Sequence, residues 1–129
     1  MNNIKTENNI DNKIKRILKG IIFSIVITLI SIFLFAVVLT YSNISETIIP
    51  VFIIVLTFCS IMIGTIMGIK NIKKNGMLNG AIIGTAYVII LYLVSSILNT
   101  GFTFNNYTIL MIISGIISGM IGGIIGINI

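Results

Sequence analysis

The sequence has no histidine, a single cysteine and few charged residues, and these shortages exclude whole classes of protein. Hydrolysis and group transfer need a base, a metal or an activated nucleophile. The only acids are Glu7, Asp11 and Glu46, which all lie outside the long apolar runs. Within those runs, Cys59 is the only residue of a type that commonly binds metal ions. We therefore expect a protein that is not an enzyme, and we identify no catalytic, cofactor-binding or metal-binding residue.

The low charge also argues against a soluble domain. Charged residues make up 9% of the 129 residues and hydrophobic residues 57%, whereas soluble domains are about 25% charged and about 45–50% apolar. A small domain buries only part of its apolar surface, so this composition predicts a membrane protein. Heavy use of Ile, Asn and Lys, which have AT-rich codons, indicates a bacterial genome of low GC content.

Four long apolar runs predict an all-α fold, a transmembrane four-helix bundle. A helix needs about 20 apolar residues to cross the ~30 Å hydrocarbon core, and it satisfies its own backbone hydrogen bonds in lipid. No run contains a charged residue, and the period-2 alternation of β-barrel strands is absent. We expect a basic tail over residues 1–19 and a transmembrane domain over residues 20–129. The predicted spans are residues 20–41, 48–69, 77–98 and 108–127.

Residues between the runs indicate where the helices begin. Thr47 is a candidate cap for the second span, and Pro50 lies in its first turn, where a missing N–H costs little. Asn75 and Gly76 form a turn-prone pair before the third span, and Asn105 or Asn106 can cap the fourth.

The basic residues predict the orientation. In a four-span chain they all fall on one side: Lys5, Lys13, Lys15, Arg16 and Lys19 in the tail, and Lys70, Lys73 and Lys74 in the second loop. Lysine and arginine in short loops mark the cytoplasmic side, so both termini of this multi-pass protein of the cell membrane are expected in the cytoplasm. Aromatic residues collect on the other side as an interfacial belt: Tyr41, Phe102, Phe104 and Tyr107. The net charge of +5 is explained by topology, and no nucleic acid partner is expected.

The tail allows two interpretations. Ile10, Ile14, Ile17 and Leu18 recur at helical spacing among basic residues, which is typical of an interfacial helix on an anionic leaflet. The alternative is a cytoplasmic extension of the first span, which we favour.

The spans pair into two similar halves. Residues 60–69 align with residues 118–127, so that Gly64 matches Gly122 and Gly68 matches Gly126. Because each half is a two-helix hairpin, the bundle is predicted to be two parallel-repeat hairpins related by an axis along the membrane normal.

Small residues form a stripe on every span and lie mostly in the predicted cytoplasmic halves, where the bundle should be tightest. The stripes are Gly20, Ser24, Thr28 and Ser31; Thr57, Ser60, Gly64 and Gly68; Gly76, Gly80 and Gly84; and Gly115, Gly119, Gly122 and Gly126. Such stripes let backbones approach in lipid, and they could also serve self-association or a membrane-protein partner. Ile112, one helix face away, is expected to face lipid.

Two functions stay open at this point. The first is a non-catalytic membrane protein acting through helix–helix or lipid contacts. The second is a small channel or transporter for a neutral or weakly polar solute, whose path Asn79, Thr85, Tyr87 and Tyr92 could line. An intramembrane acid, the usual mark of proton-coupled transport, is absent.

The start Lys19-Gly20 and the glycine pattern of residues 118–126 resemble a family of small uncharacterised four-span membrane proteins of Firmicutes, sometimes called YrzE-like. The resemblance covers the chain from about residue 15 onward. It implies a multi-pass protein of the cell membrane with no assigned activity, and it transfers no catalytic residue to this chain.

Overall fold

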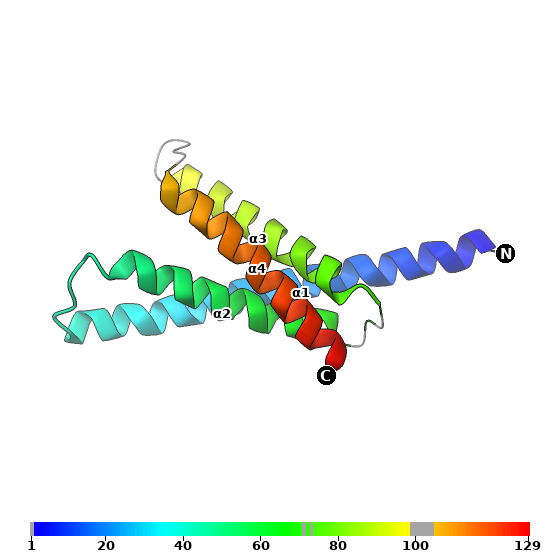
Figure 1. The fold of residues 1–129 in the computed structure, drawn as a ribbon, viewed down its shortest axis with the longest axis horizontal. Helices are drawn as coiled ribbons and strands as arrows, with labels where there is room; N and C mark the ends of the chain where they lie inside the picture. Colours follow the sequence, from blue (N-terminus) through cyan, green and yellow to red (C-terminus); the bar gives the residue numbers. More distant parts are fainter. Residues whose placement is uncertain (1, 71, 73, 99–104) are drawn as a thin grey trace.

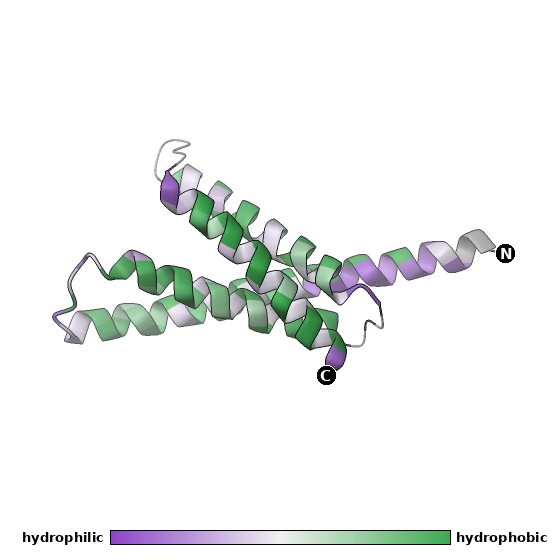
Figure 2. Cartoon of the chain, in the orientation of Figure 1, coloured by the Kyte–Doolittle hydropathy of each residue, from purple (hydrophilic) through white to green (hydrophobic). Residues whose placement is uncertain are grey.

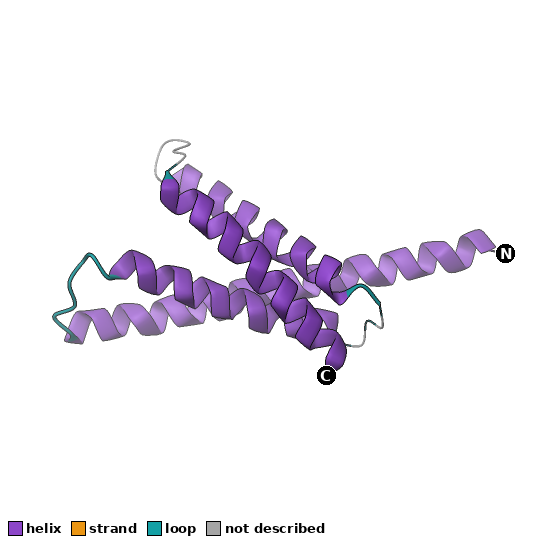
Figure 3. Cartoon of the chain, viewed as in Figure 1, coloured by secondary structure: helices purple, strands orange, loops and turns teal. Residues whose placement is uncertain are grey.

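The part of the chain that the structure describes forms four helices and contains no strand (Figure 3). The computed structural model describes residues 2–70, 72, 74–98 and 105–129. The helices are α1 (Asn2–Tyr41), α2 (Ile49–Ile69), α3 (Gly76–Leu98) and α4 (Asn106–Asn128). All four are long and apolar enough to cross a membrane. The predicted all-α, four-span architecture is confirmed, and the protein is a multi-pass membrane protein.

The helix starts agree with the sequence signals in part. Pro50 lies at the start of α2 as predicted, and Asn75 has a left-handed φ of 58° just before α3. Asn105 occupies the N-cap position of α4 but makes no capping hydrogen bond through its side chain. The prediction for Thr47 is wrong, because Ile48 is the N-cap of α2 and the Thr47 hydroxyl instead lies 2.5 Å from the Ser45 hydroxyl.

The helices form two antiparallel hairpins, α1–α2 and α3–α4, which cross each other at an angle (Figure 1). Contacts between the hairpins run mainly through α2 and α4. Both termini and the α2–α3 connection lie at one end of the molecule, here called the basic end (Figure 1). The α1–α2 connection and the facing ends of α3 and α4 lie at the other, here called the open end.

Burial is concentrated toward the basic end. Buried positions fall within residues 20–28 of α1, 57–69 of α2, 76–88 of α3 and 115–126 of α4. Beyond these stretches the two hairpins diverge toward the open end (Figure 1), and apolar residues cover much of the helix surface (Figure 2). Helices pack closely only where side chains are small, so the glycine-rich halves form the tight part of the bundle, as expected.

The tail continues α1 without a break. At 1.5 Å per residue the 40 residues of α1 extend about 60 Å, twice the ~30 Å hydrocarbon core. The first half of this helix is the hydrophilic segment at the N-terminus in Figure 2. Ile10, Ile14 and Leu18 are exposed on it, whereas Ile17 packs against the buried cluster around Ile21. The favoured interpretation, a cytoplasmic extension of the first span, and the alternative, contact of the exposed residues with a membrane surface, both stay predictions.

Candidate functional site

Glycine backbones in direct contact hold α3 against α4. A Cβ atom added to Gly80 would meet the carbonyl oxygen of Gly119, and one added to Gly119 would meet that of Gly80. A Cβ on Gly84 would likewise meet the carbonyl oxygen of Gly115, whereas one on Gly115 would meet the side chain of Val88 on α3. The contact is therefore between main chains, which the absence of side chains allows. The full seam consists of Gly76, Gly80 and Gly84 on α3 and Gly115, Gly119 and Gly123 on α4.

A shorter seam of the same kind joins α1 to α2. A Cβ on Gly68 would lie 2.5 Å from Gly20 Cα, and a Cβ on Gly64 would lie 2.6 Å from the backbone nitrogen of Ser24. These distances are far below ordinary contact, so no larger residue fits without moving a helix. Gly20, Ser24, Gly64 and Gly68 thus belong to one contact, as the stripes on the first two spans predict.

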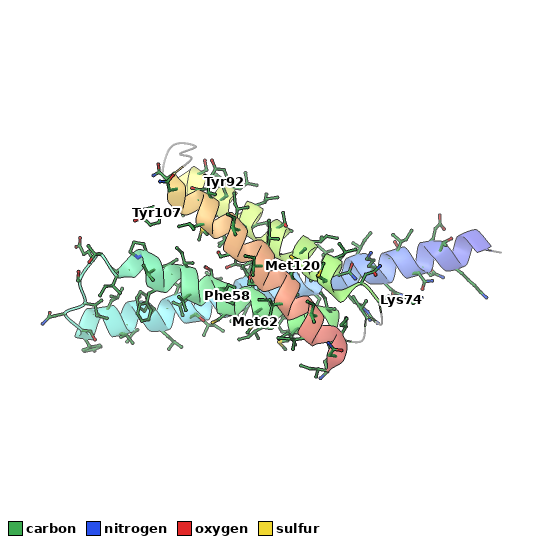
Figure 4. All side chains as sticks on the ribbon, in the orientation of Figure 1. Phe58, Met62, Lys74, Tyr92, Tyr107 and Met120 are labelled. Carbon is green, nitrogen blue, oxygen red and sulfur yellow. The ribbon has the colours of Figure 1, made fainter. Side chains whose placement is uncertain are left out.

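The fourth helix uses its glycines on two faces. Gly115, Gly119 and Gly123 face α3, whereas Gly122 and Gly126 face α2. A Cβ on Gly122 would lie 2.7 Å from Met62 O, and one on Gly126 would lie 3.2 Å from Ile66 Cα. Figure 4 shows Met62 of α2 and Met120 of α4 close to this crossing.

This arrangement corrects the residue-by-residue alignment of the two halves. Gly64 faces Ser24 within its own hairpin, whereas Gly122 faces Met62 of the other hairpin. The two glycines therefore sit in unlike environments, although the two-hairpin architecture itself is confirmed. The physical reason is that α4 has glycines on two of its faces. In α2 the motif with Gly64 contacts the other helix of its own hairpin, whereas in α4 the matching motif with Gly122 contacts the other hairpin.

Buried hydroxyls in the packed half bond mostly to their own helix. Ser24 Oγ donates to Gly20 O at 2.9 Å, and Ser60 Oγ donates to Leu56 O at 2.8 Å. Thr57 donates to the carbonyls of Ile53 and Ile54. One hydroxyl also reaches another helix, because the Thr28 and Tyr87 oxygens lie 2.6 Å apart and join α1 to α3. These hydroxyls therefore have protein partners, whereas the buried Thr65 Oγ1 has none within the described residues.

A cavity of about 390 Å³ opens between the hairpins at the open end. It takes lining residues from all four helices, and apolar side chains alternate there with hydroxyls such as Thr57 and Tyr92. Thr28 lies at its inner boundary, beside the buried Tyr87. Figure 4 places Tyr92 and Tyr107 at this end of the molecule, and Tyr41 and Tyr107 are exposed as an interfacial belt requires. Phe102 and Phe104 lie outside the described residues.

The four residues predicted to line one neutral path do not share a cavity. Tyr92 lines the cavity at the open end, while Asn79 and Thr85 line a groove near the basic end. Tyr87 is fully buried and bonded to Thr28. The prediction of one shared lining is wrong, because Asn79 and Thr85 lie toward the basic end of α3, Tyr92 lies toward its open end, and the buried Tyr87 lies between them.

A second cavity, of about 550 Å³, lies at the basic end between the tail part of α1 and the start of α3. Its lining is polar and basic: Asn9, Asn12, Lys13, Arg16, Ile72, Lys74, Asn75 and Asn79. From the sequence these cations were interpreted as a topology signal or as part of an interfacial helix, and the cavity that they line was not predicted. The available signal was the spacing of Asn9, Lys13 and Arg16, which places them on one face of a helix.

Among the described residues, no three His, Cys, Asp or Glu side chains come close enough to hold a metal ion. Cys59 is a free cysteine and is exposed on α2.

A family model described as "Protein of unknown function (DUF3792)" matches residues 13–126. The match covers all four helices except the first residues of α1 and the last residues of α4. No curated protein and no solved structure matches the chain.

Proposed function

The chain belongs to the DUF3792 family, and from that premise we propose that it is a non-catalytic membrane protein that acts through contacts of its helices with other helices or with lipid. The proposal places it in the cell membrane with both termini in the cytoplasm. The packed half is then a fixed scaffold, and the surfaces at the two ends are the parts that meet a ligand or partner.

One observation carries this proposal. The cavities at the open and basic ends are separated by buried side chains, namely Ile21, Ile83 and Tyr87, which are at most 8% exposed. Along α3 this layer occupies the turns between Asn79, which lines one cavity, and Val88, which lines the other. Close packing of this kind leaves few voids that could hold water. It therefore supports a protein that acts through contacts rather than a channel.

The first prediction is that the purified protein does not carry neutral solutes. Liposomes containing it should release or take up glycerol and urea at the rate of protein-free liposomes, because the buried layer blocks a path between the cavities. Stopped-flow light scattering measures this rate. A Tyr87→Ala variant, which removes the largest side chain of the layer, is the informative control. Flux by the unaltered protein, reduced by a larger residue at Thr57, would instead support a channel.

One observation favours the alternative function, a small channel or transporter. The cavity at the open end combines apolar walls with the Thr28, Thr57 and Tyr92 side chains, which is the mixed lining a weakly polar solute would use. The liposome experiment above decides between the two functions, because helix or lipid contacts alone predict no flux.

The second prediction concerns orientation, which rests on the distribution of lysine and arginine. In a Cys59→Ser background, a cysteine at Asn43 should react with a membrane-impermeant maleimide added to intact cells. A cysteine at Lys74 should react only after lysis, since the basic end is placed in the cytoplasm. Both positions are exposed, so differences in labelling report the side of the membrane. Labelling at residue 74 in intact cells would reverse the proposed orientation.

A further inference from the structure

The cavity at the basic end is a cup rich in positive charge. Lys13 and Arg16 contribute to it from α1, and Lys74 contributes from the connection before α3. Figure 4 labels Lys74 beside the tail part of α1. Glu7 and Asp11 do not line the cup. At about 100° per residue, each lies roughly 160° around α1 from Asn9, on the opposite side of the helix. The described lining thus brings three cations and no carboxylate to one place.

An apolar groove continues directly from this cup. It has a volume of about 560 Å³ and shares Lys13, Asn75 and Asn79 with the cup. From there it follows one face of α3 from Leu78 to Ile89. The rise of a helix makes this stretch about 16 Å long, roughly half of the ~30 Å hydrocarbon core. The groove therefore has the depth of a single leaflet.

Asn79 lies where the cup meets the groove, and its hydrogen bonding is incomplete. The residue is 2% exposed, and its Nδ2 donates to Lys74 O at a long 3.5 Å. Its Oδ1 has no hydrogen-bond partner within the described part of the chain. A buried acceptor without a donor costs free energy, so a bound hydroxyl group would relieve that cost.

We infer that the basic end binds an anionic phospholipid of the phosphatidylglycerol class. The phosphodiester lies in the cup among the three cations, a headgroup hydroxyl donates to Asn79, and one acyl chain follows the groove on α3. A zwitterionic headgroup fits less well, because its own ammonium group is repelled by the same cations. This inference rests on the lipid-contact part of the proposed function and names the lipid.

The third prediction tests this site by native mass spectrometry of the full chain in detergent micelles, titrated with dioleoylphosphatidylglycerol or dioleoylphosphatidylcholine. Phosphatidylglycerol should bind about tenfold more tightly, since basic residues near a membrane favour anionic lipid. The combined variant Lys13→Gln, Arg16→Gln and Lys74→Gln should remove that preference. Filling the groove with Ala81→Phe should also weaken phosphatidylglycerol binding, because the acyl chain loses its place.

The matched control is Lys15→Gln with Lys19→Gln and Lys70→Gln, which removes equal charge from residues that do not line the cup. It should keep the lipid preference. Equal effects of the two triple variants, or displacement of the lipid by equimolar inorganic phosphate, would overturn the inference. If the cup triple variant does not fold, Lys74→Gln alone replaces it, because Lys74 is exposed. Solute flux by a protein that still binds phosphatidylglycerol would refute the proposed function and leave this site standing.

Discussion

Replacing Gly84 with leucine should cost the bundle about 1–3 kcal/mol of unfolding free energy or more, the range typical of overpacked cores. The Cβ of any larger residue at this position would meet the Gly115 carbonyl oxygen and come within 3.3 Å of Gly119 Cα. Both atoms belong to the backbone of α4, so no side-chain rotation can relieve the overlap. The helices must separate and lose dispersion contacts along the seam, which in lipid have little hydrophobic effect to replace them.

The measurement is unfolding of the purified protein in dodecyl maltoside micelles by added dodecyl sulfate, followed by circular dichroism. The matched control is Ala36→Leu, which adds a similar side chain at an exposed position of α1. Exposed substitutions usually change stability by no more than about 0.5 kcal/mol. Equal stability of the two variants would mean that the α3–α4 seam is not formed in the membrane protein.

Ile112 cannot serve as the lipid-facing control, although the sequence predicts that role for it. It is partly buried and packs against the cluster of Ile61, Tyr87 and Val88. The prediction failed because it considered one neighbour for α4, whereas α4 contacts both α3 and α2. A helix with two neighbours buries a wider arc of its surface than a single stripe of small residues indicates.

The helices themselves were predictable, since the signal is strong and local. An uncharged run of about 20 apolar residues has few stable conformations in lipid other than a helix, and α2, α3 and α4 begin and end within two residues of the predicted spans. The glycine-rich halves were predictable for a similar reason, because close approach of backbones needs small residues. Every described glycine of the four stripes is buried.

The partners of each glycine could not be predicted from the sequence. In α4, Gly119, Gly122 and Gly126 recur at spacings of three and four, which are compatible with one helix face. Only the crossing of the two hairpins shows that Gly119 faces α3 while Gly122 and Gly126 face α2. The cup at the basic end was hidden for the same reason, since its lining comes from residues more than 60 positions apart, such as Arg16 and Asn79.

The two faces of α4 give the final prediction, a graded response to alanine. A Cβ on Gly123 would meet Gly76 O and come within 3.0 Å of Gly80 Cα, whereas the nearest atom to a Cβ on Gly126 is Ile66 Cα at 3.2 Å. Gly122 is intermediate, with Met62 O at 2.7 Å. Replacing glycine with alanine stabilises a helix by roughly 0.5–1 kcal/mol at each of these positions. Differences in stability among the three alanine variants therefore reflect packing.

Gly123→Ala should therefore lower the unfolding free energy by about 1–2 kcal/mol, since the overpacking penalty exceeds the helix gain. Gly126→Ala should change it little, because a shift of a few tenths of an ångström accommodates the methyl group, and Gly122→Ala should fall between them. The same dodecyl sulfate titration ranks the three proteins. A reversed order, with Gly126→Ala the least stable, would mean that α4 is rotated and presents its other glycine face to α3.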